Sequence, residues 1–173
     1  RSVLTNAAGL DGNTATFQSL TGITKITHDV ANAAANDGDD DANAVTISGS
    51  YTGTADALTL AIDNAGTNAG ASAMGALTVN GVEAITVDVT GGADNDTATV
   101  NGIASSTLDS LVVTSSGFSE DAVNIVLGTV SDGSNDNMTS FDASASVTGV
   151  SVTLADMGSA SSVIGSDYAD III

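Results

Sequence analysis

The chain has 173 residues, of which 21 are acidic and two are basic, so its formal net charge is −19 at pH 7. Binding to nucleic-acid phosphates or to anionic lipid needs clustered Lys and Arg, and this charge balance excludes both kinds of partner. An apolar content of 42% and a mean hydropathy of +0.26 exclude a disordered chain, while no run of about 18 apolar residues could form a membrane-spanning helix.

The apolar side chains follow the period of two that is typical of β-strands with one buried face. In chain order, Val, Ile and Leu alternate with other residues over the ranges 45–48, 58–63, 85–89, 123–127 and 150–154. Between these ranges the chain is rich in Asn, Asp, Gly and Ser, at 36–43, 91–96, 115–121 and 131–137. Because these residue types favour turns, the sequence predicts short strands separated by polar turns.

Two kinds of degenerate repeat run along the chain. Residues 20–30 superpose without gaps on residues 79–89, and looser echoes of this unit begin at Leu108 and Met138. A second unit places an Asp before a short strand, at 56–60, 96–100, 121–125 and 167–171. We therefore expect two alternating types of strand, one of each type in every rung of a repetitive structure.

These observations predict an all-β fold, and specifically an irregular parallel β-solenoid of the β-helix or β-roll type built from degenerate repeats. Only 3% of the residues are aromatic, which suits a thin core of stacked aliphatic side chains. The uneven spacing of the strands leaves a β-sandwich as the alternative. We expect residues 1–173 to form one repetitive region, with sub-repeats at about 1–78 and 79–173, that is a fragment of a longer chain.

The acidic turns are candidate calcium sites, because Ca²⁺ takes six to eight oxygen ligands from carboxylates, amides and backbone carbonyls. The 37–48 segment is not an EF-hand loop, because Ala42 and Ser48 replace its required Gly and Glu. Because the chain has only two basic residues to offset its net charge of −19, repulsion between its acidic groups favours the binding of divalent ions. The candidate ligands are Asp37, Asp39, Asp41, Asn43, Asp94, Asp96, Glu120, Asp121, Asp132, Asp136, Asp167 and Asp170.

Catalytic chemistry has little support in the sequence. The single histidine, His28, takes the position of Val87 in the repeat, so we expect it on the apolar face of a strand in a structural role. No Gly-x-Ser-x-Gly or phosphate-binding motif occurs, and the chain lacks Cys and Trp. We therefore expect a protein that is not an enzyme.

Two short segments carry a family resemblance. Residues 165–172, Gly-Ser-Asp-Tyr-Ala-Asp-Ile-Ile, resemble the run that introduces the calcium-binding nonapeptide repeats of RTX proteins. Residues 81–87, Gly-Val-Glu-Ala-Ile-Thr-Val, resemble degenerate repeats of Caulobacter-type bacterial surface-layer proteins, which leave the cell by type I secretion. The resemblance implies an extracellular, calcium-dependent protein that assembles with its own copies into a lattice or filament on the cell surface.

Three functions stay open at this point. The leading expectation is a structural segment of an S-layer or surface filament, cohering through acidic turns bridged by Ca²⁺, with a cell-surface polysaccharide as a further partner. The alternative is a segment of an RTX-type adhesin that binds a host or biofilm ligand. A third is a spacer or secretion domain attached to an extracellular hydrolase.

Overall fold

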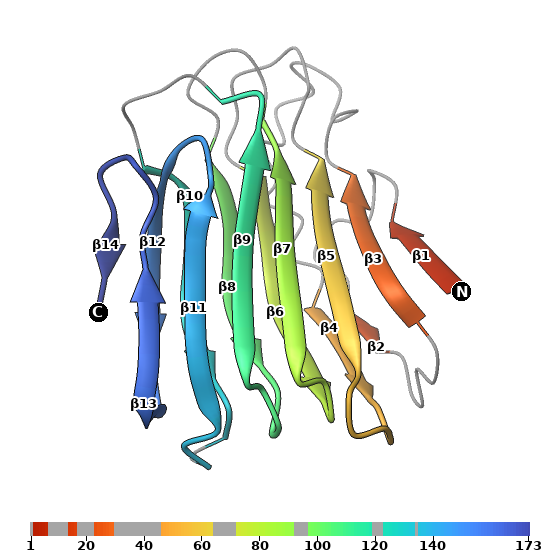
Figure 1. The fold of residues 1–173 in the computed structure, drawn as a ribbon. Helices are drawn as coiled ribbons and strands as arrows, with labels where there is room; N and C mark the ends of the chain where they lie inside the picture. Colours follow the sequence, from red (N-terminus) through yellow and green to blue (C-terminus); the bar gives the residue numbers. More distant parts are fainter. Residues whose placement is uncertain are drawn as a thin grey trace.

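The computed structural model describes residues 2–6, 14–16, 23–29, 46–63, 72–91, 97–118, 123–133 and 135–173. The regular elements within these ranges are all β-strands, and they form two parallel sheets that lie one behind the other (Figure 1). Each strand from β3 to β12 pairs with the strands two before and two after it in the sequence, so the chain winds between the sheets as a β-solenoid. The predicted parallel β-solenoid is confirmed, and the β-sandwich alternative is wrong.

One sheet contains only odd-numbered strands and the other only even-numbered ones. The odd-strand sheet consists of β1 (Ser2–Asn6), β3 (Ile23–Asp29), β5 (Ala57–Asp63), β7 (Ala84–Thr90), β9 (Ser110–Ser116), β11 (Met138–Ala145) and β13 (Met157–Ile164). The even-strand sheet consists of β2 (Thr14–Thr16), β4 (Thr46–Ser50), β6 (Ser72–Asn80), β8 (Ala98–Ala104), β10 (Val123–Ser131), β12 (Gly149–Leu154) and β14 (Ile171–Ile172).

The core lies between the two sheets and consists of columns of aliphatic side chains. Along β7, for example, Ile85, Val87 and Val89 are buried while the residues between them are more exposed. The parallel register repeats this pattern, so that Leu60 pairs with Val87 and Val87 with Val113. Because each side chain stacks on an equivalent one in the next turn, mostly aliphatic residues fill the core, and its aromatic members are Tyr51, Phe118 and Phe141.

The two predicted strand types agree with the sheets, with one exception. All four units of the first type fall on odd strands, namely β3, β7, β9 and β11. The second type falls on β8, β10 and β14, but its first member, 56–60, lies on β5 in the odd-strand sheet, so that assignment was wrong. The pairing of the strands also places Ile26 level with Val87, which is 61 residues later in the sequence. The superposition of the repeats had predicted an offset of 59 residues.

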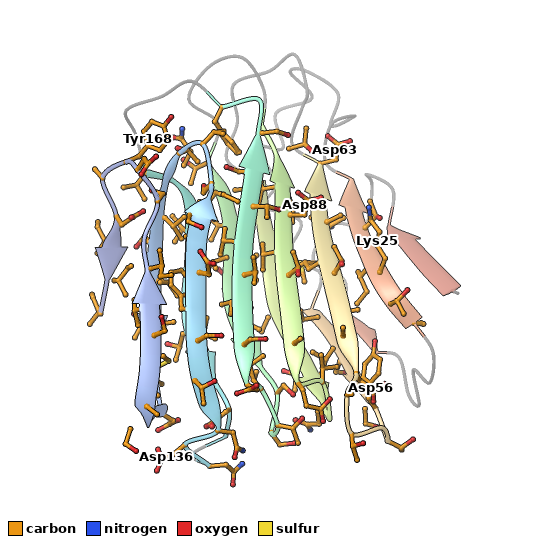
Figure 2. All side chains as sticks on the ribbon, in the orientation of Figure 1. Lys25, Asp56, Asp63, Asp88, Asp136 and Tyr168 are labelled. Atoms are coloured by element: carbon orange, nitrogen blue, oxygen red, sulfur yellow. The ribbon has the colours of Figure 1, made fainter. Side chains whose placement is uncertain are left out.

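The solenoid has two lateral edges that differ in their connections. At one, which we call the turn edge, the even strands from β4 to β12 lead into the next odd strands through the segments 51–56, 81–83, 105–109, 132–137 and 155–156. At the opposite edge β11 leads into β12 through residues 146–148, and β13 leads into β14 through residues 165–170. Figure 2 shows Asp56 and Asp136 at the turn edge, and Asp63 and Tyr168 toward the opposite one.

Candidate functional site

Of the twelve predicted calcium ligands, four lie in the described part of the chain. Asp132 and Asp136 lie at the turn edge between β10 and β11, whereas Asp167 and Asp170 lie between β13 and β14. The structure therefore does not bring these two pairs together. The other eight predicted ligands lie outside the described residues: Asp37, Asp39, Asp41, Asn43, Asp94, Asp96, Glu120 and Asp121.

Asp132 organises the turn that leads into β11. Its side chain is fully buried. The carboxylate accepts hydrogen bonds from the backbone N–H groups of Asn135 at 3.1 Å, Met138 at 3.2 Å and Asn137. Asp136, in contrast, is exposed and adopts a left-handed backbone conformation with φ of 53°. Backbone donors thus surround the Asp132 carboxylate, an arrangement typical of a structural turn.

Asp170 has a similar role in the last turn of the solenoid. It accepts hydrogen bonds from the backbone N–H of Ser166 at 2.7 Å and from the Ser166 hydroxyl at 2.8 Å. It also accepts one from the backbone N–H of Val150 at 2.8 Å, which ties this turn to β12. Asp167 is exposed. The segment that resembles the RTX run is therefore a turn, held by the Asp170 carboxylate, that leads into β14.

A row of carboxylates that are not among the twelve predicted ligands lies along the turn edge. Asp56, Glu83 and Asp109 each immediately precede an odd strand, and the pairing of β5, β7 and β9 stacks them in successive turns. The carbonyl of Asp56 accepts from the N–H of Glu83 at 3.1 Å, and that of Glu83 accepts from the N–H of Asp109 at 2.8 Å. We call these three residues the acid ladder.

The ladder side chains accept hydrogen bonds from their neighbours. Asp56 accepts from the N–H of Gly53 at 2.8 Å, while Glu83 accepts from the N–H of Asp56 at 2.7 Å. Asp109 accepts from the hydroxyl of Thr139 at 2.6 Å, and Thr139 takes the ladder position in the following turn. Neighbouring turns lie about 4.8 Å apart, and two unit charges at that spacing repel by about 1 kcal/mol in water. A cation at this edge would relieve that repulsion.

The fit of these residues to a bound metal can be judged from their arrangement. Nowhere in the described ranges do three or more His, Cys, Asp or Glu side chains gather closely enough to hold one metal ion. The ladder is a row with one carboxylate per turn, and Ca²⁺ needs six to eight oxygens around a point. The described carboxylates of one chain thus do not form a closed calcium cage.

Two other polar side chains, those of His28 and Tyr51, are buried. His28 is buried on the inner face of β3, level with Ile62, which confirms the predicted position on the apolar face. Tyr51 is buried at the turn edge and donates a hydrogen bond from its hydroxyl to the carbonyl of Ile23 at 3.0 Å. Burial raises the pKa of Tyr51 above its ordinary value of 10.0, and the nearby Asp56 carboxylate adds to the increase.

Comparison with protein-family models, curated proteins and solved structures finds no match to this chain. None of the described residues belongs to a helix that could span a membrane.

Proposed function

We propose that this chain is a structural segment of a calcium-dependent extracellular assembly, an S-layer or surface filament, and that it catalyses no reaction. The observation that supports the proposal best is the acid ladder, which aligns the carboxylates of three successive turns along one edge of a chain with a net charge of −19. Copies with this charge repel one another, and divalent cations between their acidic edges turn that repulsion into cohesion.

Calcium in this proposal lies between copies. Each ladder supplies a few carboxylate oxygens, and the ladder of a neighbouring copy supplies the rest of the six to eight that Ca²⁺ requires. The assembly lies on the cell surface, where a polysaccharide is its anchoring partner. The family resemblance of residues 81–87 and 165–172 supports the same function, because it implies an exported, calcium-dependent surface protein.

The proposal is tested by titrating the metal-free chain with Ca²⁺ while light scattering follows assembly and a thermal melt follows stability. Saturation to about 100 times the dissociation constant stabilises a protein by about 2.7 kcal/mol, which corresponds to an increase in Tm of roughly 5–11 °C for a chain of this size. Excess chelator reverses both effects, and Mg²⁺ at the same ionic strength does not reproduce them. Unchanged scattering and Tm in Ca²⁺ and in chelator would refute the proposal.

A pair of matched variants tests the role of the ladder. Asp109 and Asp88 each accept a hydrogen bond from a Thr hydroxyl on the neighbouring strand, at 2.6 and 2.8 Å, but only Asp109 belongs to the ladder. Asp109→Asn is expected to raise the Ca²⁺ concentration needed for half-maximal assembly, whereas Asp88→Asn leaves it unchanged. Equal effects of the two variants would show that only the total charge matters.

A further inference from the structure

The tetrapeptide Thr-Val-Asn-Gly occurs twice in the chain, at 78–81 and at 99–102, and the fold gives the two copies different surroundings. They contain the only Asn-Gly pairs of the sequence. An Asn-Gly pair is prone to deamidation, because glycine has no side chain to shield its backbone nitrogen from the Asn carboxamide. Since the two local sequences match, a difference in reactivity between Asn80 and Asn101 must come from the fold.

Asn80 is exposed and is the last residue of β6, where the chain enters the turn edge. The N–H of Val82 donates a hydrogen bond to the carbonyl of Val79 at 3.3 Å, which closes a four-residue turn. Gly81 is the third residue of this turn and has a φ of +85°, whereas φ of Asn80 is not positive, as in a type II turn. Among the described residues, no group forms a hydrogen bond with the Asn80 carboxamide or with the Gly81 N–H.

One hydrogen bond holds the peptide group between Asn80 and Gly81. The carbonyl of Asn80 accepts it from the N–H of Tyr51 at 2.7 Å. Rotation of this single peptide group breaks that bond and turns the Gly81 nitrogen toward the Asn80 carboxamide, while the strands on either side stay paired. Because an opening of this size costs little free energy, the folded chain can reach the reactive conformation.

Asn101 is also exposed, but it lies in the middle of β8, between β6 and β10 in the even-strand sheet (Figure 1). Gly102 is in register with Ala76 on one side and with Thr129 on the other. The strands are closely packed here, since a Cβ added to Gly128 would collide with the carbonyl oxygen of Asn101. Rotation of the peptide group between Asn101 and Gly102 therefore requires the sheet itself to open, which costs much more free energy.

We infer that the folded chain deamidates itself at Asn80 and not at Asn101, so that residue 80 is a site of covalent modification. Hydroxide removes the proton of the Gly81 N–H, and the nitrogen attacks Cγ of Asn80. The bond from Cγ to Nδ2 breaks, and ammonia leaves with a proton from water, which closes a five-membered succinimide ring. A water molecule then adds to one of the two ring carbonyls and opens the ring. Opening at Cγ gives aspartate, and opening at the main-chain carbonyl carbon gives isoaspartate.

The product adds a carboxylate to the turn edge. Each conversion takes the formal net charge of the chain from −19 to −20. Residue 80 immediately precedes the segment 81–83, which contains Glu83 of the acid ladder. In the isoaspartate form the main chain is one carbon longer between Val79 and Val82, so the hydrogen bond that closes this turn cannot keep its geometry. Deamidation therefore changes both the charge and the backbone of the turn between β6 and β7.

The test compares the two sites within one molecule. The 173-residue chain is incubated in H₂¹⁸O at mildly alkaline pH, and peptide mapping by mass spectrometry follows the uptake of ¹⁸O at residues 80 and 101 over time. A parallel incubation in guanidinium chloride measures both sites in the unfolded chain. Asn80→Gln is the control variant, because its longer side chain would have to close a six-membered ring.

We expect Asn80 to convert at least about 10-fold faster than Asn101 in the folded chain, which corresponds to a difference of about 1.4 kcal/mol in the free energy of opening. In guanidinium chloride the two sites should react at similar rates, and Asn80→Gln should take up no ¹⁸O at residue 80 in the folded chain. Equal rates in the folded chain, or faster conversion of Asn101, would overturn the inference. A folded chain that stays unmodified at Asn80 would overturn it as well, whatever the unfolded chain does.

Discussion

The buried carboxylate of Asp132 provides a direct test of whether the acidic turns are held by their own backbone or by a metal ion. In the structure this carboxylate accepts hydrogen bonds from the N–H groups of Asn135, Asn137 and Met138. Asp132→Ala removes the acceptor from all three donors at once. If the turn is held by these bonds, the variant is destabilised whether or not Ca²⁺ is present.

The size of the effect follows from the three bonds. A hydrogen bond to a charged group contributes about 1.5–3 kcal/mol net, and the donors of Asn135 and Asn137 lie in an exposed part of the turn, where water replaces part of that loss. We therefore expect the free energy of unfolding to fall by about 3–5 kcal/mol. For a chain of this size, each kcal/mol shifts Tm by about 2–4 °C, so Tm should fall by roughly 6–20 °C.

The measurement is a thermal or urea melt of wild type and variant in chelator and again in excess Ca²⁺. Asp136→Asn is the matched control, because it removes the same charge from an exposed position of the same turn and Asn tolerates the left-handed backbone there. It should change stability by less than about 0.5 kcal/mol. The reasoning is refuted if Asp132→Ala melts like wild type in chelator and differs from it only in Ca²⁺, since Asp132 would then act as a metal ligand.

Three further predictions concern the core and the turn edge. Gly81→Ala should cost at least about 1–2 kcal/mol, because φ is +85° and an added Cβ would collide with the carbonyl oxygen of Tyr51; a melt within error of wild type would contradict this. The raised pKa of Tyr51 favours its protonated form in the folded state, so its contribution to stability is complete below about pH 10 and is lost as the pH rises through the folded pKa. Tyr51→Phe should therefore show a flatter decrease of Tm with pH in this range, although it is less stable at neutral pH because the bond to the carbonyl of Ile23 is lost; parallel pH curves would count against the assignment. Phe141→Ala should lower the free energy of unfolding by about 3–5 kcal/mol, because the fully buried Phe141 ring fills the core against β11. A decrease of less than about 1 kcal/mol in a urea melt would show that the core collapses around the cavity.

The sequence predicts the strands well where one face is apolar. The ranges 58–63, 85–89 and 150–154 coincide closely with β5, β7 and β12. It does not predict β13, whose Gly-Ser-Ala-Ser-Ser run lacks alternation and becomes a strand because it pairs with β11. The internal repeat was misaligned by two residues, an offset of 59 against the observed 61. Since side chains alternate with a period of two, that error keeps each residue on its correct face, which is why the buried position of His28 was predicted even so.

The acidic residues were harder to interpret, because local density in the sequence does not reveal the chemical environment of a carboxylate. Asp132 belongs to a turn that is rich in Asp and Asn, yet burial and backbone donors determine its role, and neither is visible in the sequence. The acid ladder is the opposite case, since Asp56 and Glu83 are 27 residues apart and belong to no cluster. In a solenoid, residues one turn apart are neighbours in space, so the informative spacing is the length of a turn. The available signal for the acid ladder was an acidic residue immediately before each of several successive odd strands. This signal can be recognised only when the register of the strands is known.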